Sequence, residues 1–341
     1  MTAYRLSAMR LAIVTDAWDP QVNGVVTTYR NLVRQLSNLG HEVCLLTPEG
    51  FNTIPCPSYP SIRLAVLPKR GVWRQLAEFR GQGIHIATEG PLGHAARAFC
   101  VRHKTSFSTA FHTQFPEYIR LRAPVPISWS YAYLRRFHAR AKRTLVATPS
   151  QLERLRGWGF SHLAIWGRGV DVETFRPADK NGLLDLPRPI AMYMGRVAVE
   201  KNIEDFLRLD LSGSKIVIGD GPDREKLSQR FPQVRFLGQK LGRDLASHLA
   251  CADVLVFPSR TDTYGLAMLE AMACGVPVAA YPVTGPIDLI RPGVTGCLDQ
   301  DLRKAVAQAL PLSPDDCVAF AQNHSWKACA ERFLACLAVV S

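Results

Sequence analysis

The sequence of 341 residues lacks several patterns that would place it in a class at once. Its nine cysteines include no C-x-x-C pair, so neither a zinc site of that kind nor a disulfide framework is indicated, and we expect reduced thiols in a cytoplasmic protein. No apolar run reaches the roughly 20 residues of a membrane-spanning helix. The apolar stretch 11–14 is followed at once by Asp16, so we expect no signal peptide, and we expect residues 1–8 to be an extension.

Acidic residues are scarce in one half of the chain only. Residues 1–180 contain 24 Lys and Arg against 11 Asp and Glu, whereas residues 181–341 contain 17 against 18. A hydrophobic content of 47% is that of an ordinary globular protein, and the length suggests two domains. The uneven charge indicates that one domain, the first, meets an anionic partner.

Apolar strand-like runs alternate with helical patterns in both halves, which predicts parallel α/β sheets with right-handed crossovers. In the first half we expect a proline-rich loop at 51–60 and a strand at 62–67, and in the second half a turn at 293–297. Proline and glycine gather near residues 168–189, where we place the link between the domains. The predicted division is 9–170 for the first domain, 171–188 for the linker, 189–325 for the second domain and 326–341 for a C-terminal helix.

The first strand, 11–15, is followed by a glycine turn into a helix. Asn23 and Gly24 begin a helix that we expect to run from Val25 to about Leu39. The Gly24 amide at the positive end of this helix suits an anion, although a purely structural turn explains the same residues. The turn carries no G-x-G-x-x-G string, so there is no dinucleotide fingerprint here.

A second candidate anion site follows the strand predicted at 190–194. Arg196 and Lys201 bracket a helix start there, and two fixed cations beside backbone amides suit a diphosphate. The alternative is that both are surface charges on a turn.

The stretch 254–280 is predicted to be strand, loop, buried helix and strand. We expect Asp262, with Thr261 and Thr263, to cap the helix, and Glu270 to lie about two turns inside it. A buried carboxylate is costly without a partner. Glu270 therefore either pairs with an internal group or serves a ligand.

His112 stands just past the strand predicted at 105–111, at the edge where α/β sheets bind ligands. A histidine that satisfies a loop carbonyl is the alternative.

Residues 101–143 carry nine Lys and Arg and one acid, Glu117. We expect a helix over 128–143 in which Trp129, Tyr133, Leu134 and Phe137 share a face, with arginines beside it. The aromatic residues are expected to pack on the sheet. The basic residues form a candidate membrane patch, since anionic lipid attracts such segments by about 1 kcal/mol per charge. The patch consists of Arg135, Arg136, Arg140, Lys142 and Arg143.

Taken together, these strings resemble those of family 4 glycosyltransferases, which have the GT-B fold of two Rossmann-like domains facing across a cleft. The resemblance rests on P-Q-V-N-G-V, F-H-T, G-V-D-x-x-x-F-x-P, G-R-x-x-x-E-K-N, G-D-G-P-D and an acid-x7-acid motif. It covers nearly the whole chain after Met9. Most members carry Glu as the first acid, whereas this chain has Asp262, which is one methylene shorter.

The resemblance implies a role for each candidate residue. Glu270 would bind the nucleotide ribose, Asp262 the donor sugar, and His112 the donor phosphate or sugar. Arg196, Lys201 and the Gly24 amide would stabilise the departing diphosphate. The remaining donor-binding positions implied are Gly219, Tyr264, Gly265 and Leu266.

The function implied is retaining transfer of a hexose, of mannose or glucose type, from a nucleotide diphosphate sugar to a lipid or glycolipid hydroxyl. No metal or other cofactor is expected, because Arg and Lys can take the role of a divalent ion. The subgroups that the strings resemble are bacterial glycolipid mannosyltransferases and diacylglycerol glycosyltransferases. We expect an enzyme of the cytoplasm, peripherally bound to the anionic inner membrane, with no nucleic-acid partner.

Other functions stay open at this point. A polysaccharide or small-molecule acceptor fits the same motifs. A sugar-nucleotide epimerase or a hydrolase-like protein would need paired carboxylates flanking the sugar. A nucleic-acid or membrane-binding module explains the basic half but leaves Arg196, Lys201 and Glu270 without a role.

Overall fold

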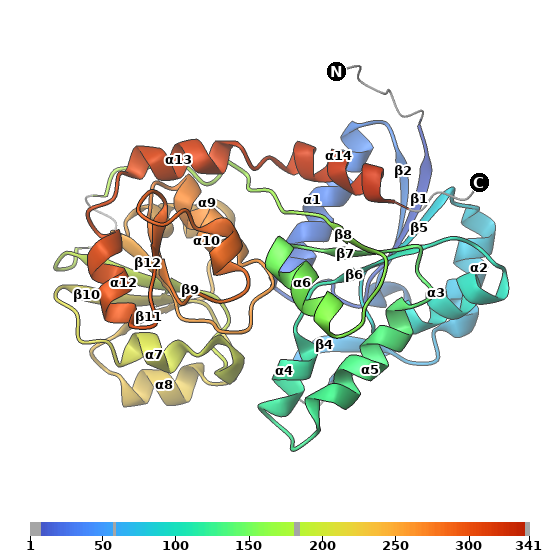
Figure 1. Cartoon of the computed structure of the whole chain (residues 1–341), viewed down its shortest axis with the longest axis horizontal. Coiled ribbons are helices and arrows are strands. Elements are labelled where there is room, and N and C mark those ends of the chain that lie inside the picture. The colour runs from blue at the N-terminus through green and yellow to red at the C-terminus, as the bar shows by residue number, and fades with distance from the viewer. Residues whose placement is uncertain (1–7, 57–58, 181–184, 338–341) are drawn as a thin grey trace. The chain divides into compact units, whose positions relative to one another are not determined.

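The computed structural model describes residues 8–56, 59–180 and 185–337. The chain divides into two compact units. The first consists of residues 1–116, 124–167 and 326–341, and the second of residues 117–123 and 168–325. Each unit is built on its own six-stranded sheet (Figure 1).

The large sheet of the first unit is parallel throughout, with the strand order β2-β1-β5-β6-β7-β8. Its strands are β1 (Arg10–Val14), β2 (Glu42–Leu46), β5 (Gly83–Ile86), β6 (Ser108–Phe111), β7 (Arg143–Val146) and β8 (Leu163–Ile165). The helices of the first unit are α1 (Gly24–Asn38), η1 (Pro48–Gly50), α2 (Lys69–Phe79), α3 (Pro91–Arg102), α5 (Ile127–His138), α6 (Pro149–Gly157) and α14 (Trp326–Cys336). α4 (Phe115–Arg120) begins in the first unit and ends in segment 117–123, which groups with the second unit.

Successive side chains of a strand point to opposite faces of the sheet, and here both faces are covered. On one face, apolar residues of α2, α3 and α5 form a core with Ile84 and Ile86 of β5. His85, between them, points the other way and meets Phe333 of α14, with ring centroids 4.9 Å apart. The C-terminal helix thus completes the first unit, where it also packs against α1.

The stretch 51–67 differs from the prediction. β3 (Thr53–Cys56) and β4 (Tyr59–Ala65) form a separate antiparallel pair, where we expected a loop at 51–60 and a strand at 62–67. Pro55, which indicated a loop, lies within β3. Both strands of a two-stranded sheet are edges, and an edge strand tolerates proline.

The sheet of the second unit is also parallel, with the order β11-β10-β9-β12-β13-β14. Its strands are β9 (Ile190–Met194), β10 (Ser214–Ile218), β11 (Arg235–Gly238), β12 (Val254–Phe257), β13 (Val278–Ala280) and β14 (Gly296–Leu298). Its helices are η2 (Val199–Lys201), α7 (Ile203–Leu207), α8 (Arg224–Arg230), α9 (Gly242–Ala250), α10 (Leu266–Ala273), α11 (Pro286–Leu289), α12 (Leu302–Ala309) and α13 (Pro314–Gln322). The turn expected at 293–297 is wrong in its second half, because β14 begins at Gly296; a three-residue strand carries little local signal.

The order of strands reverses once in each sheet, between β1 and β5 and between β9 and β12. In open α/β sheets, ligands bind beyond the carboxyl ends of the strands at such a reversal. The loops after these strands are therefore where a site is expected.

Several predicted segments lie partly outside the described residues: 1–7 of the expected extension, 181–184 of the linker and 338–341 of the C-terminal helix. Within the described ranges, no helix has both the length and the apolar character that crossing a bilayer requires.

Candidate functional site

The loop after β9 presents Arg196 at the reversal point of the second sheet. Gly195 precedes it with a φ of +153°, a conformation that favours glycine. The hydroxyl of Tyr193 donates to the carbonyl oxygen of Arg196 at 2.6 Å. The backbone of Arg196 is thus fixed by a buried tyrosine, and Lys201 follows at the end of η2.

Lys201 is paired with Asp262 in the loop after β12, its Nζ donating to Oδ2 at 2.7 Å. Burial, the largest single effect, lowers the pKa of Lys201, but the charge of Asp262, the hydrogen bond to it and the nearby tyrosines together raise it more, so the net shift is upward. The amine is therefore held in its charged form, as binding a diphosphate requires.

This pairing corrects the expected helix cap. Asp262, Thr261 and Thr263 do not cap α10; the N-cap is Gly265, without a side-chain cap bond. A largely buried ammonium group needs a counter-charge more than the helix needs a cap, because desolvating an unpaired charge costs several kcal/mol, whereas an N-cap contributes about 1 kcal/mol.

Glu200, which precedes Lys201, is the buried acid of this region, with 2% of its surface exposed. Arg122 Nη2 donates to its Oε2 at 2.5 Å, and Arg196 Nη1 lies 3.9 Å from its Oε1. Glu200 therefore contacts Arg196, a predicted site residue, and Arg122, which sequence analysis missed. An acid between two cations of one turn was the signal that could have revealed Glu200.

Arg122 belongs to segment 117–123, which groups with the second unit. Tyr118 of the same segment is close enough for Lys201 and Asp262 to affect its pKa, which burial raises above its usual range. Sequence analysis missed both residues, because Arg122 stands 78 positions before Glu200 and no local pattern points to that contact.

Glu270 lies one turn inside α10, not two, and its carboxylate has no hydrogen-bond or ion-pair partner among the residues that the structure describes. Burial raises its pKa from 4.5 to about 7. The alternative that Glu270 pairs with an internal group therefore finds no support. A desolvated carboxylate without a protein partner can accept hydrogen bonds from ligand hydroxyls.

The predicted donor-binding glycines of the second unit have structural roles as well. A Cβ at Gly219 would lie 1.8 Å from the carbonyl oxygen of Gly195, so only glycine fits there. Gly265 has a φ of +84° and begins α10, next to the buried Tyr264. The amides of Gly265 and Leu266 therefore stand at the positive end of a helix, as an anion site requires.

In the first unit, Gly24 is the exposed first residue of α1, and the predicted strand–turn–helix is confirmed. Asn23 Oδ1 accepts from the amides of Val25 and Val26 at 2.9 and 3.1 Å. The N-terminus of this helix is thus built around Asn23 and leaves Gly24 at the surface. A role for Gly24 toward a diphosphate remains a prediction.

His112 directly follows β6 and is half-buried. Its Nε2 lies 2.8 Å from the hydroxyl of Tyr29 in α1. The same hydroxyl lies 2.7 Å from Nε2 of the fully buried His85 in β5. His112, which the sequence predicts to contact a ligand, is therefore hydrogen-bonded to a buried tyrosine that sequence analysis did not find.

Asp16, after β1, is a buried acid with a structural task. It accepts hydrogen bonds from the amides of Leu92 and Gly93 at 2.8 and 3.2 Å and from the Thr88 hydroxyl at 2.8 Å. α3 has Gly90 as its N-cap and therefore no side-chain cap of its own, so Asp16 supplies one. Burial raises the pKa of Asp16 to about 6 in spite of these bonds.

The five residues of the predicted membrane patch come from different elements of the first unit. α5 ends at His138, so the helix does not continue to Arg143 as expected. Arg143 begins β7 and donates to the carbonyl oxygen of Ala335 in α14 at 3.3 Å. Lys142 is exposed just before that strand, because the chain turns sharply from helix to strand there.

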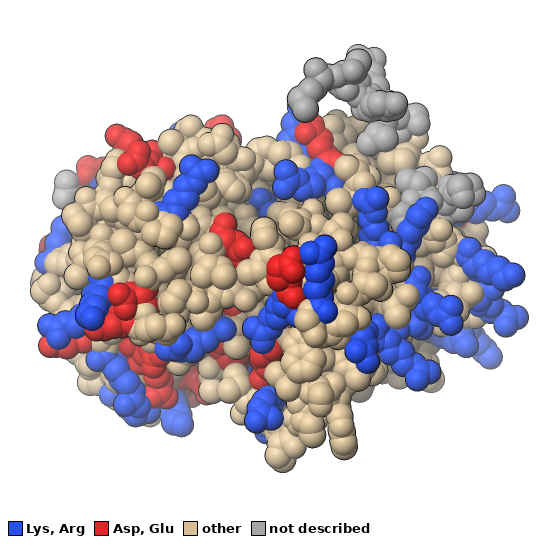
Figure 2. Space-filling model, viewed as in Figure 1, with Lys and Arg blue, Asp and Glu red and all other residues tan. Residues whose placement is uncertain are grey.

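Arg136 and Arg140 instead lie near Arg97 of α3, whose pKa is lowered by partial burial and by these two like charges. Beside them, Trp129 and Tyr133 are 70% and 54% exposed, so the expectation that these aromatic residues pack on the sheet is wrong. The buried face of α5 consists of Tyr131, Leu134, Phe137 and His138. Figure 2 shows Lys and Arg gathered over the part of the first unit that carries α2, α3 and α5.

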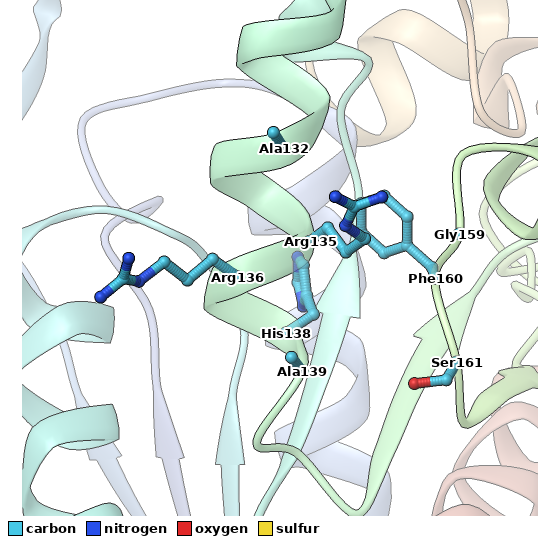
Figure 3. Close-up of a pocket in the computed structure, with 8 residues that line it drawn as sticks. All are labelled: Ala132, Arg135, Arg136, His138, Ala139, Gly159, Phe160 and Ser161. Atoms are coloured by element: carbon cyan, nitrogen blue, oxygen red, sulfur yellow. The ribbon is translucent and has the colours of Figure 1, made fainter.

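A pocket of about 480 Å³ opens on the other side of α5. In Figure 3 the side chains of Arg135 and Arg136 point to opposite sides of α5. Arg135 Nη1 donates to the carbonyl oxygen of Trp158 at 3.2 Å, which ties it to the loop before β8. The residues that line this pocket are Ala132, Arg135, Arg136, His138, Ala139, Gly159, Phe160 and Ser161. None of them is a predicted donor-binding residue.

Among the described residues, no three His, Cys, Asp or Glu side chains gather as a metal site would require. The sequence does contain one D-x-D string, at 299–301, and its acids serve the turn before α12: Asp299 Oδ1 accepts from the amide of Asp301, whose own carboxylate accepts from the Arg303 amide.

Comparison with known proteins finds two family profiles on this chain. The profile described as Glycosyltransferase Family 4 matches residues 22–174, and the one described as Glycosyl transferases group 1 matches residues 188–311.

Two relatives and one solved structure illustrate the similarity. A GDP-mannose-dependent alpha-mannosyltransferase of Mycolicibacterium smegmatis is 33% identical over 318 residues, covering 85% of this chain and 84% of the relative. An alpha-monoglucosyldiacylglycerol synthase of Acholeplasma laidlawii is 25% identical, covering 79% of each chain. The fold is similar to that of sucrose-phosphate synthase from Thermosynechococcus elongatus, with a TM-score of 0.77 at 21% identity, over 96% of this chain and 98% of that one.

Proposed function

Because the chain belongs to the family 4 glycosyltransferases and is a hexosyltransferase, we propose that it transfers a hexose from a nucleotide diphosphate sugar to a lipid hydroxyl with retention of the anomeric configuration. The observation that carries the proposal is the set of charges in the second unit. Arg196 and Lys201 follow β9, and Glu270, a carboxylate without a partner among the described residues, follows β12. Two cations that can bind a diphosphate and one carboxylate that can accept hydrogen bonds from hydroxyls thus follow the two strands, β9 and β12, between which the strand order reverses.

Each charge has a part in the proposed reaction. Glu270 accepts hydrogen bonds from the ribose hydroxyls and so orients the nucleotide. Arg196 and Lys201 neutralise the diphosphate, whose negative charge grows as its bond to the anomeric carbon breaks. Asp262 and the first amides of α10 hold the sugar, with the Gly24 amide and His112 as further contacts.

The chemical step needs no protein nucleophile. The acceptor oxygen forms a bond to the anomeric carbon on the face from which the phosphate oxygen departs. The hydroxyl proton of the acceptor passes to that departing oxygen, and a nucleoside diphosphate is released. We propose that the step is independent of metal, because two side-chain cations stand where a divalent ion would supply the same charge.

The donor and acceptor are proposed from the relatives. One relative is named for GDP-mannose and another for a glucosyl-diacylglycerol product, so a mannose- or glucose-type donor and a diacylglycerol or glycolipid acceptor are the first to test.

We further propose that the first unit binds an anionic membrane from the cytoplasmic side. Arg97, Arg136 and Arg140 are close enough for their charges to interact, and Trp129 and Tyr133 stand exposed on α5. Aromatic rings favour the lipid head-group region, and basic residues are attracted to anionic lipid. Together they suit a peripheral contact that brings a lipid acceptor to the enzyme.

A thermal-shift panel of GDP, UDP and ADP sugars tests the donor site. A ligand that binds the folded state alone raises the melting temperature, so one donor should stabilise the protein and Glu270→Gln should abolish most of the shift. Lipid extracts incubated with that donor should then gain one hexose by mass. No stabilisation by any sugar nucleotide would refute the donor site. Transfer to polysaccharide alone, or epimerised donor without transfer, would favour the other functions.

A further inference from the structure

The turn that carries Lys201 is hydrogen-bonded on both sides to the stretch after β12. On one side, the carbonyl oxygen of Glu200 accepts from the hydroxyl of Thr261 at 2.9 Å. On the other side, Nδ2 of Asn202 donates to the carbonyl oxygen of Pro258 at 3.1 Å. Asn202 has a φ of +51°, a left-handed conformation that asparagine adopts more readily than most residues but that is still strained for a residue with a Cβ. The side-chain contacts of Asn202 therefore help to hold this turn.

Asp205, in α7, is a second acceptor for the side chain of Asn202. Its Oδ2 accepts from Nδ2 of Asn202 at 2.6 Å and from the hydroxyl of Tyr281 at 2.7 Å. Tyr281 directly follows β13 and is 5% exposed. Burial and the hydrogen bond to Asp205 raise the pKa of this phenol to about 12, so Tyr281 keeps its hydrogen and is the donor. One carboxylate oxygen thus joins the turn after β9 to the loop after β13.

The loop after β13 also contacts the loop after β12. The guanidinium carbon of Arg260 lies 3.5 Å from the centroid of the Tyr281 ring, a cation–π contact. A Cβ at Gly285 would lie only 3.3 Å from the carbonyl oxygen of Asp262, so the two backbones approach closely. The loop after β13 therefore supports both members of the pair between Lys201 and Asp262.

We infer that Asp205 is a positioning residue of the donor site, which holds Lys201 where a diphosphate binds. It acts through Asn202, whose side chain it fixes, and needs no contact with the diphosphate itself. The inference rests on the proposed function, in which Lys201 neutralises the diphosphate. A lysine side chain is a flexible four-carbon stem, so an anchored backbone reduces the conformational entropy that is lost on binding. Removing Asp205 should therefore weaken diphosphate binding only while Lys201 is present.

Hydrogen exchange tests the anchoring of the turn without any ligand. The amides of Lys201 and Asn202 close the turn of η2 with hydrogen bonds of 3.0 and 3.1 Å. Both should exchange about tenfold faster in Asp205→Ala than in the wild type, while the amides of β9 keep their protection. Unchanged exchange in the turn, or an equal increase in β9, would overturn the inference.

The affinity for GDP, UDP and ADP tests the consequence for the donor site. For the nucleotide that the wild type binds most tightly, Asp205→Ala should raise Kd about tenfold. Asp205→Asn keeps an oxygen that can accept both hydrogen bonds, so Kd should rise less than about threefold. Glu204→Gln is the matched control in α7 and should bind like the wild type, because Glu204 contacts the exposed Arg208 and Arg230. A loss in Asp205→Asn as large as in Asp205→Ala would overturn the inference.

A double-mutant cycle with Lys201→Met separates positioning from a general loss of structure. In the Lys201→Met background, Asp205→Ala should change Kd by less than about twofold, because the side chain that it positions is gone. A full tenfold loss in that background, or no loss from Asp205→Ala alone, would overturn the inference while the proposed function stands. A wild type that binds none of the three nucleotides would refute the proposed function and the inference together.

Discussion

Lys201 and Asp262 are joined across the reversal point of the second sheet, with Nζ and Oδ2 2.7 Å apart although 61 residues separate them in sequence. In this arrangement Asp262 neutralises the cation that the diphosphate is proposed to bind. The pair keeps a largely buried ammonium charged, and an incoming diphosphate must share it or replace the carboxylate.

This competition predicts opposite effects of two substitutions. Lys201→Met should weaken nucleoside diphosphate binding at least tenfold, because it removes a charge-assisted contact. Asp262→Asn should bind the nucleoside diphosphate at least as tightly as the wild type, since Lys201 loses its counter-charge, yet turn over the sugar donor more slowly. Isothermal titration with the nucleoside diphosphate distinguishes them. Equal loss of affinity in both variants would show that Asp262 supports the diphosphate site directly.

Glu270→Gln should stabilise the protein at alkaline pH. The pKa of this carboxyl is raised from 4.5 to about 7 by burial, so its contribution to stability is full below pH 4.5 and is lost as pH rises through 7. After allowance for partial exposure to solvent, the variant should gain about 1 kcal/mol of unfolding free energy at pH 8 and almost none at pH 4.5. Urea denaturation at the two pH values measures this.

The control for that experiment is Glu204→Gln, since the pKa of Glu204 is lowered, first by its hydrogen bond from Arg208. This substitution should not stabilise the protein at pH 8. A Glu270→Gln variant that is less stable than the wild type at pH 8 would mean that the carboxylate has a stabilising partner after all.

The affinity for the sugar nucleotide should fall as pH drops below 7. Glu270 must be ionised to accept hydrogen bonds from both ribose hydroxyls, and protonation in the free protein competes with that. Titrations between pH 5.5 and 8 should show this decline in the wild type and a flat, weaker profile in Glu270→Gln. The same pH dependence in the variant would assign the titration to another group.

Arg122→Ala should lower the unfolding free energy by about 1.5–3 kcal/mol, because it removes a hydrogen bond to the buried carboxylate of Glu200. The double variant Arg122→Ala with Glu200→Gln should recover part of the loss. Arg120→Ala, which removes an exposed arginine at the end of α4, two residues before Arg122, serves as the control in urea denaturation. Similar losses in both arginine variants would place the effect in α4 rather than in the contact with Glu200.

Binding to anionic vesicles should depend on Arg136 and Arg140 but not on Arg143. Reversal of the first two to Glu should weaken binding at least tenfold at low salt, since each basic residue contributes about 1 kcal/mol near anionic lipid. Arg143→Glu should bind like the wild type, because its guanidinium contacts α14. Co-sedimentation with vesicles measures both, and the difference should shrink at high salt. An equal loss of vesicle binding in both variants would show that the net charge of the protein, and not a defined basic surface, determines binding.

Local sequence patterns predicted much of the fold. Strand-to-helix turns such as Asn23–Gly24 and Gly195–Arg196 depend on residues a few positions apart, so spacing predicted them, and the family and the GT-B fold that the motifs suggested are confirmed. The alternation of strands and helices likewise predicted the two parallel sheets.

Local sequence patterns did not predict which charged and polar side chains contact one another. Asp262 pairs with Lys201 rather than capping α10, and Arg122 contacts Glu200. The Tyr29 hydroxyl lies within hydrogen-bond distance of His85 in β5 and of His112 after β6. Parallel sheets bring together strand ends that are distant in sequence, and a desolvated charge or hydroxyl takes the partner that this geometry supplies. Backbone preferences act between neighbours along the chain, so they shape the turns; only packing in three dimensions selects which side chains meet.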